Sequence, residues 1–259
     1  MKIHTTLLSG AGNTFHILSD QAGSFFADSP EKRKILARDI CEKTPADGFI
    51  YLKKLESGSF NWFFYNKDGS DAEMCGNATR CVGYFVRNIM SDSEAKWTLQ
   101  TAAGVITIAS LSENLFQVIM TPIQVLKSDL GFFCNTGVPH LVIEVESLAT
   151  AKLIKAQAQS LRQHESFGPA GTNVTYVQKL MDPKSVKAVS FERGVEDFTE
   201  ACGTGAVAAA AYNLKKYSVV ETNVEMPGGL LIMNLADLNK PKMNGPATFL
   251  GSYDYEYKF

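Results

Sequence analysis

Two segments of this chain carry a Cys-Gly step in similar surroundings, and they constrain the fold more than any other feature. The first runs over residues 64–81 (FYNKDGSDAEMCGNATRC) and the second over residues 191–208 (FERGVEDFTEACGTGAVA). At a constant offset of 127 positions the two segments align without a gap, with Cys75 on Cys202. Because this offset is about half of the 259 residues, the pattern predicts a duplicated fold in which each half presents one cysteine.

Each of these cysteines comes directly before a segment that predicts a helix. After Cys202 follows an alanine-rich run, residues 206–211, with strong helix propensity. After Cys75 the apolar residues recur at helical spacing, at Val82, Phe85, Val86, Ile89 and Met90. A thiol at the start of a helix meets free N–H groups and the positive end of the helix dipole, which favour the thiolate. Two such thiols predict a paired acid and base, able to take a proton from one face of a carbon and return one to the other.

The remaining periodicity predicts a mixed α/β protein of the α+β type. Helices are expected at 30–43 and 148–164, in addition to the two that follow the cysteines. Short apolar or β-branched runs predict strands at 3–8, 97–101, 105–109, 116–120, 141–145, 174–178, 186–191, 223–226, 230–235 and 248–251. We expect two pseudo-symmetric lobes, each a curved, mostly antiparallel sheet or barrel around a central helix.

Turns predict where one lobe ends and the other begins. Thr121-Pro122 and Gly245-Pro246 are the best candidates for such turns. The N-terminal lobe, with Cys75, is therefore expected to span residues 1–120 and to be completed by about 247–259. The C-terminal lobe, with Cys202, is expected to span residues 121–246.

Composition and charge exclude several classes of partner. The chain has 25 basic and 27 acidic residues and no basic run, so nucleic acid is not expected as a partner. No apolar stretch has the length of a membrane span, and the N-terminal residues do not resemble a signal peptide. Five cysteines without such a peptide predict reduced thiols in the cytoplasm. The four histidines are scattered and no cysteines show the paired spacing of zinc ligands, so no metal site is expected.

A cysteine before an apolar helix has a simpler interpretation as a packing residue, because cysteine is among the most buried residue types. For a single Cys-Gly step we would favour packing. Two steps at matching positions of a duplicated chain favour chemistry instead. Cys41, Cys81 and Cys134 have no such setting, and we expect all three to serve only in packing.

Several further motifs lie in an order that is typical of one enzyme family. They are Gly10–Phe15 (GAGNTF), Ala46–Gly48 (ADG), Asn66–Cys81, Gly137 with Pro139-His140, Asn173-Val174, Glu192–Gly205 and Pro227–Gly229 (PGG). With these motifs, which extend over almost the whole length, the chain resembles the diaminopimelate epimerases. The resemblance implies a cofactor-independent isomerase that converts LL-diaminopimelate to meso-diaminopimelate, for lysine and peptidoglycan precursors. It also implies an amino acid as the small-molecule substrate, and it leaves the oligomeric state open, with a homodimer as one arrangement.

The resemblance assigns roles to residues of this chain. It implies that Cys75 and Cys202 are the thiolate and thiol that exchange protons with the α-carbon. The N–H groups that bind the α-carboxylate would be those around Gly76, Asn77, Gly203 and Thr204. His140 and Glu192 would lie beside the sulfurs, where they hold the substrate ammonium or tune the thiols. The residues that hold the far end of the substrate would be Asn13, Asn66, Asn173 and Arg193.

These residues also have simpler interpretations. The asparagines could be turn residues that bind their own backbone, as is usual for Asn near Gly. His140 could be a hydrogen-bonded core histidine, and Glu192 with Arg193 could form a surface ion pair.

Departures from the family pattern leave the substrate open. Val138 stands where the family has Asn, so one polar contact to the far end of the substrate is missing. Phe198 replaces an acidic residue, and Ala78 replaces a glycine. Two alternatives therefore remain: a racemase, also independent of pyridoxal phosphate, that acts on a different amino acid, and a non-catalytic relative that binds a metabolite.

Overall fold

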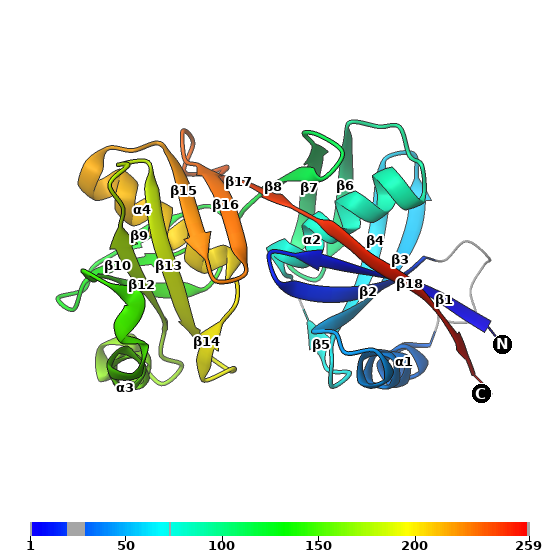
Figure 1. Cartoon of the computed structure of the whole chain (residues 1–259), viewed down its shortest axis with the longest axis horizontal. Coiled ribbons are helices and arrows are strands. Elements are labelled where there is room, and N and C mark those ends of the chain that lie inside the picture. Colours follow the sequence, from blue (N-terminus) through cyan, green and yellow to red (C-terminus); the bar gives the residue numbers. More distant parts are fainter. Residues whose placement is uncertain (1, 20–28, 73, 258–259) are drawn as a thin grey trace. The chain divides into compact units, whose positions relative to one another are not determined.

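The computed structural model describes residues 2–19, 29–72 and 74–257. The chain forms two compact units (Figure 1). The N-terminal unit comprises Met1–Val118 and Gly245–Phe259, and the C-terminal unit comprises Ile119–Asn244. In the N-terminal unit the last strand, drawn red, returns to pair with the first, drawn blue (Figure 1).

The N-terminal unit is a mixed sheet with two helices. Its strands are β1 (Lys2–Gly10), β2 (Asn13–Ser19), β3 (Gly48–Glu56), β4 (Ser59–Asn66), β5 (Asp71–Ala72), β6 (Lys96–Thr101), β7 (Gly104–Ser110), β8 (Leu115–Ile119) and β18 (Thr248–Glu256). Its helices are α1 (Pro30–Lys43) and α2 (Gly76–Tyr84), and α2 continues into a π-helical turn, Phe85–Ile89. Strands β2 and β3, and likewise β4 and β6, pair in parallel, while the other pairs in this unit are antiparallel.

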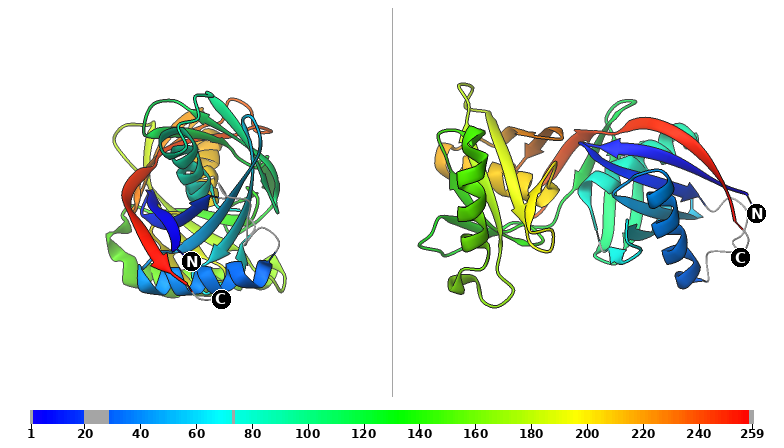
Figure 2. Two further views of the ribbon diagram at one scale, coloured as in Figure 1. Left: turned by 90° about the vertical axis from the view of Figure 1, so that its right-hand side faces the viewer. Right: turned by 60° about the horizontal axis from the view of Figure 1, so that its bottom comes forward.

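Helix α2 is the central element of the N-terminal unit (Figure 2, left). Every residue from Gly76 to Gly83 is buried, and Ala78 and Val82 pack in a core with Phe60, Trp97 and Phe116. Small residues allow this depth: a Cβ atom on Gly83 would lie 2.8 Å from side-chain atoms of Ile108 and Phe116. Helix α1 lies outside the sheet and covers a second apolar cluster.

The π-helical turn corrects one prediction. An α-helix extended to Met90 would place Ile89 on the buried stripe, but Ile89 is 42% exposed. The N–H of Met90 donates to the carbonyl of Phe85, five residues back, so the helix widens by one residue in this turn. The widening rotates Ile89 outward while Met90 still packs against the core.

From β10 to β17 the C-terminal unit repeats the order of helices and strands found from β1 to β8, and β9 precedes this repeat. Its strands are β9 (Gln124–Leu126), β10 (Phe132–Asn135), β11 (Pro139–Glu144), β12 (Asn173–Lys179), β13 (Ser185–Glu192), β14 (Asp197–Thr199), β15 (Glu221–Met226), β16 (Gly229–Asn234) and β17 (Lys242–Pro246). Its helices are α3 (Ala151–Arg162) and α4 (Gly203–Tyr217), with short 3₁₀ turns at Leu148–Thr150 and Glu165–Phe167. Strands β11 and β12 pair in parallel and are connected through α3, as β2 and β3 are through α1. Strands β13 and β15 also pair in parallel, and α4 lies in the connection between them, as α2 does between β4 and β6.

Helix α4 is the counterpart of α2. Its alanine-rich stretch, residues 206–211, is buried throughout, because small side chains let the surrounding strands approach the helix closely. The fold class predicted from the sequence is thus confirmed: each unit is a mostly antiparallel sheet around a central helix. Among the described residues, no helix combines the length and the apolar character that a bilayer crossing requires.

Candidate active site

In the N-terminal unit, Cys75 is the N-cap residue of α2. Its backbone is extended (φ −143°, ψ 122°), and its carbonyl oxygen accepts hydrogen bonds from the N–H and the hydroxyl of Thr79, both at 2.9 Å. Gly76 and Asn77 form the first turn, whose N–H groups have no acceptor within the helix. The thiol is half-buried at the edge of the core. The sequence-based expectation of a cysteine at a helix start is therefore met at this position.

A series of side-chain hydrogen bonds between amide and guanidinium groups holds the start of α2 in place. The Asn77 side-chain NH₂ donates to Asn13 Oδ1 at 2.7 Å, and Arg80 Nη2 donates to Asn77 Oδ1 at 2.8 Å. Asn13 in turn donates to the Asp47 carboxylate at 3.3 Å. Arg80 is completely buried, and this burial lowers its pKa to about 10, although the neighbouring Cys81 and Cys75 thiols raise it. A buried positive charge thus lies in the helix that Cys75 begins.

Asn66 lies in a turn at the end of β4. Its side chain donates to Ser70 Oγ at 3.0 Å, and its backbone N–H donates to the Ser70 carbonyl at 2.9 Å. Gly69 closes the turn with a φ of 83°, which favours glycine. Asn66 thus has the structural role of a turn residue, and its exposed position also leaves it accessible to a ligand.

In the C-terminal unit, Cys202 is the N-cap residue of α4. Its sulfur accepts a hydrogen bond from the N–H of Gly205 at 3.3 Å and lies 3.3 Å from Thr204 Oγ1. A Cβ atom on Gly205 would overlap Ser190 Oγ, so a side chain at this position would displace Ser190. Cys202 is only 5% exposed, and its pKa rises to about 12, first through burial and then through the negative charge of Glu192.

Glu192 faces Cys202 from the end of β13. Its carboxylate accepts a short hydrogen bond from the Thr199 hydroxyl and is hydrogen-bonded to Cys202. Burial raises the pKa of Glu192, while these two hydrogen bonds oppose the shift. The Arg193 side chain is exposed, and its backbone N–H donates to Asn173. Glu192 therefore interacts with the catalytic candidate rather than with its neighbour in the sequence.

His140 lies fully buried in β11 and is linked to Cys202 through Thr204. Its Nε2 lies 3.0 Å from Thr204 Oγ1 and 3.3 Å from Asn173 Nδ2, and its Nδ1 lies 2.9 Å from Thr175 Oγ1. Burial lowers the pKa of His140 to about 3, so the ring is neutral near pH 7.

The structure brings one predicted set together and leaves another dispersed. Cys202, Thr204, His140, Asn173 and Glu192 form a single hydrogen-bonded network, whereas Asn66 lies in a turn apart from the Asn13–Asn77 contact.

Sequence reasoning missed three hydroxyl groups of the C-terminal unit. Thr175 and Ser190 are paired across β12 and β13, and Ser190 is paired with Thr199 across β13 and β14. A signal for Thr175 was present, because it follows Asn173 by two positions and so shares its face of the strand.

Comparison with known proteins agrees with these motifs. A family model described as diaminopimelate epimerase matches residues 5–126 and 132–250. The diaminopimelate epimerase of Aquifex aeolicus (strain VF5) is 38% identical over 230 residues, which cover 81% of this chain and 80% of that protein. That of Methanocella arvoryzae is 32% identical and covers 99% of this chain and 98% of that protein. The chain belongs to the diaminopimelate epimerase family.

Solved structures with low sequence identity share the fold. A phenazine biosynthesis protein of the PhzF family from Bacillus anthracis matches with a TM-score of 0.75 at 13% identity, covering 99% of this chain and 100% of that one. A hydroxyproline epimerase from Agrobacterium vitis matches with a TM-score of 0.65 at 14% identity, covering 98% and 92%. At these identities the likeness concerns the fold alone.

Two departures from the diaminopimelate epimerase pattern have clear positions. Val138 is half-buried in the turn between β10 and β11, where its carbonyl accepts a hydrogen bond from the Thr136 N–H at 3.1 Å. The Phe198 ring packs edge-on against Phe191 and Tyr176, with centroid distances of 5.5 and 6.3 Å. Phe198 therefore contributes to packing, whereas Val138 changes a turn that precedes His140.

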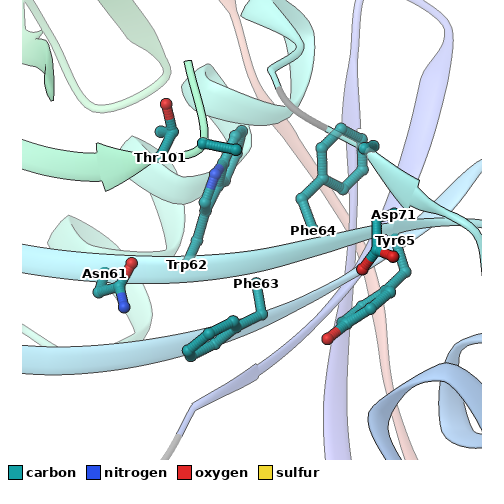
Figure 3. A pocket seen from close by; sticks show the side chains of 9 residues that line it. Asn61, Trp62, Phe63, Phe64, Tyr65, Asp71 and Thr101 are labelled. Carbon is teal, nitrogen blue, oxygen red and sulfur yellow. The ribbon is translucent and has the colours of Figure 1, made fainter. Parts of the chain in front are cut away.

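A pocket of about 310 Å³ lies in the N-terminal unit (Figure 3). It is lined by Asn61, Trp62, Phe63, Phe64, Tyr65, Asp71, Ala72, Thr101 and Ala102, from β4 and the ends of β5 and β6. These lining residues include none of the predicted site residues. Among the described residues, no three His, Cys, Asp or Glu side chains gather in a way that could hold a metal ion.

Proposed function

We propose that this protein epimerises LL-diaminopimelate to meso-diaminopimelate, with Cys75 and Cys202 as the acid/base pair. The observation that carries the proposal is that both cysteines are N-cap residues of the two central helices, at matching positions of a duplicated fold in this family. The reaction supplies precursors of lysine and peptidoglycan. We place it in the cytoplasm, where the five free cysteines would stay reduced.

The chemistry requires one thiolate and one thiol. The α-proton of an amino acid is weakly acidic, so the negative charge that develops on its removal must be stabilised electrostatically. The N–H groups of Gly76, Asn77, Gly203 and Thr204 lie at the positive ends of two helices, which suits them to bind the α-carboxylate. One sulfur takes the α-proton as its base, and the other donates a proton to the opposite face of the carbon.

Glu192 has a double role in this proposal. Burial favours the thiol form of Cys202 before substrate binds, and the negative charge of Glu192 adds to this effect, because a carboxylate beside a sulfur disfavours the thiolate. The ammonium group of the substrate is the natural partner of this carboxylate. When the ammonium binds, it offsets the negative charge and makes the thiolate of Cys202 easier to form.

The far end of diaminopimelate carries a second ammonium and a second carboxylate. Arg193 is suited to the carboxylate, because its side chain is exposed and a guanidinium can form two parallel hydrogen bonds with one carboxylate. Asn66 and Asn13 can supply further polar contacts. Both ends of the Asn173 amide are occupied by Arg193 and His140, so we assign Asn173 a supporting role.

The direct test is conversion of LL-diaminopimelate by the purified protein, with the stereoisomers separated by chiral chromatography. We expect an equilibrium mixture of LL and meso forms from either starting isomer. Absence of conversion, by protein whose thiols are reduced and whose fold is verified, would contradict the proposed function.

Val138 supports a second candidate, a racemase of the same kind that acts on a different amino acid. A valine in place of a polar residue would suit a substrate with a less polar side chain. Deuterium incorporation from D₂O, measured for a panel of amino acids, separates the two candidates. Faster exchange with another amino acid than with diaminopimelate would favour the second.

A further inference from the structure

The network around Cys202 contains one hydroxyl group with two acceptors within reach. Thr204 Oγ1 lies 3.3 Å from the sulfur of Cys202 and 3.0 Å from Nε2 of His140. The backbone of Thr204 is held in place, because its carbonyl accepts a hydrogen bond from Thr136 Oγ1 at 3.0 Å. A hydroxyl has a single proton to donate. Its direction must therefore depend on the state of its two neighbours.

The orientation of Asn173 determines which nitrogen of His140 carries the proton. Asn173 Oδ1 accepts from the backbone N–H of Arg193 at 2.7 Å, so its NH₂ group is the end that lies 3.3 Å from His140 Nε2. An NH₂ group can only donate, so Nε2 is the accepting, unprotonated nitrogen. The ring proton is therefore on Nδ1, which donates to Thr175 Oγ1 at 2.9 Å. The Thr175 hydroxyl can in turn donate a hydrogen bond to Ser190 Oγ, also at 2.9 Å.

We propose that the Thr204 hydroxyl donates a hydrogen bond to either His140 Nε2 or Cys202 Sγ, and that the charge on Cys202 determines which of the two accepts it. When Cys202 is a thiol, its S–H group donates to the Glu192 carboxylate, and the Thr204 hydroxyl donates to Nε2 of His140. When Cys202 is a thiolate, the hydroxyl turns to the sulfur and joins the N–H of Gly205 as a donor. The NH₂ group of Asn173 then donates the remaining hydrogen bond to Nε2 of His140. The hydroxyl proton stays on Thr204 throughout, while the proton of Cys202 is exchanged with the α-carbon.

This arrangement stabilises the thiolate without leaving a buried group unpaired in either state. An unpaired buried acceptor is costly, and a hydrogen bond to an ionised sulfur is stronger than one between neutral groups. His140 acts here as a positioning residue, since its Nε2 accepts a hydrogen bond from the Thr204 hydroxyl when that hydroxyl does not donate to the sulfur. The inference rests on the proposed function, because it concerns the reactive thiol of that mechanism, and it adds Thr204 as a further catalytic residue through its side chain.

The test measures the thiolate of Cys202 in the full chain without any substrate. In a Cys75→Ser background, the rate of alkylation of Cys202 by iodoacetamide is followed with peptide-resolved mass spectrometry at about pH 8.5, where the rate reports the thiolate fraction. We expect Thr204→Val, which removes the hydroxyl, to slow alkylation by about tenfold or more. Thr204→Ser keeps the hydroxyl, and its rate should stay within about threefold of the parent.

Equal rates for Thr204→Val and Thr204→Ser would overturn the proposal. If Thr204→Val unfolds, Thr204→Ala provides a second hydroxyl-free variant for the same comparison. An independent readout is the ¹⁵N spectrum of the His140 ring in the parent protein, where we expect a proton on Nδ1 and none on Nε2. A protonated Nε2 would also overturn the proposal. Neither measurement uses diaminopimelate, so failure here is distinct from failure of the proposed function.

Discussion

The two cysteine sites share a backbone geometry but differ in the side chains around it. At the offset of 127 positions that relates the two halves, Asn13 matches His140 and Asn77 matches Thr204. Both matched pairs are in contact: Asn77 donates to Asn13 at 2.7 Å, and His140 Nε2 lies 3.0 Å from Thr204 Oγ1. The N-terminal pair consists of two fixed amides, whereas the C-terminal pair contains a hydroxyl that can rotate.

Charge differs between the sites as well. The fully buried guanidinium of Arg80 lies in the helix that begins at Cys75; burial lowers the pKa of the guanidinium, and its interaction with Cys75 opposes that shift. The carboxylate of Glu192 lies beside Cys202 and raises the pKa of that thiol. Both units thus place a cysteine at the start of the central helix, while the charged side chains near the two cysteines differ. We expect the resting protein to hold the thiolate more readily at Cys75 than at Cys202.

The largest expected effect is loss of either cysteine. Cys75→Ser and Cys202→Ser should each lower kcat by about 10²–10⁴-fold or more, because a serine hydroxyl is a far weaker acid and base than a thiol. Steady-state kinetics with both stereoisomers measures the loss, and circular dichroism checks the fold. Cys41→Ala is the matched control, since Cys41 packs in the apolar cluster that α1 covers, and it should keep its activity. Near-normal turnover by either serine variant would refute the two-base assignment.

The next prediction concerns variants that remove the charge near each cysteine. Glu192→Gln removes the negative charge, so the pKa of Cys202 should fall, by about one unit or more. Arg80→Gln removes the positive charge, so the pKa of Cys75 should move in the opposite direction. Peptide-resolved alkylation across a pH series measures both shifts in the same experiment. Shifts of the same sign in the two variants would show that the sites do not differ in charge as described.

A smaller effect is expected at the turns that lead into the matched pairs. Val138 lies in the turn between β10 and β11, and Ala11 takes the matching place between β1 and β2. A hydrogen bond to a charged group contributes about 1.5–3 kcal/mol, so Val138→Asn should improve kcat/KM for diaminopimelate about tenfold or more, mainly through KM. Ala11→Ser tests whether any polar residue in such a turn has this effect. An unchanged or lower kcat/KM for Val138→Asn would favour the substrate alternative.

The smallest expected effect concerns stability in acid. His140 has a pKa of about 3 in the folded protein against an ordinary value of 6.5, so its neutral form contributes stability above pH 6.5 that declines as the pH falls toward 3. One histidine can change stability by at most about 1.4 kcal/mol per pH unit. His140→Gln should flatten this dependence in urea unfolding.

Part of the acid dependence should remain in that variant, because burial also lowers the pKa of His16 in the N-terminal unit. Identical slopes for the parent and His140→Gln would contradict the buried, neutral assignment of His140. His16→Gln is the matched variant in the other unit.

The sequence predicted the duplication, the helix after each cysteine and the fold class, because periodicity and helix-start signals are local. It did not predict β3 or β4, although their aromatic and β-branched residues are typical of strands. The π-helical turn was missed because an extra residue in one turn leaves no periodic signal. The roles of Thr175 and Ser190 depend on the register between β12 and β13, which the sequence does not specify.

The candidate site shows the same difference between features with a local sequence signal and features that depend on tertiary contacts. Both cysteines could be placed at helix starts from local pattern alone, whereas the contact of Glu192 with Cys202 depends on tertiary structure. Phe198 illustrates the limit: as a departure from a motif it suggests altered chemistry, but the structure shows it packed against Phe191.

The most direct test of the two-base account is the fate of the α-proton during a single conversion in D₂O. Early in the reaction of LL-diaminopimelate, the account predicts that the meso product carries solvent deuterium at the inverted carbon while the remaining substrate keeps its proton. This follows because the base that takes the proton is not the acid that supplies the new one. A product that retains the substrate proton would indicate one group that serves both faces, and would contradict the account.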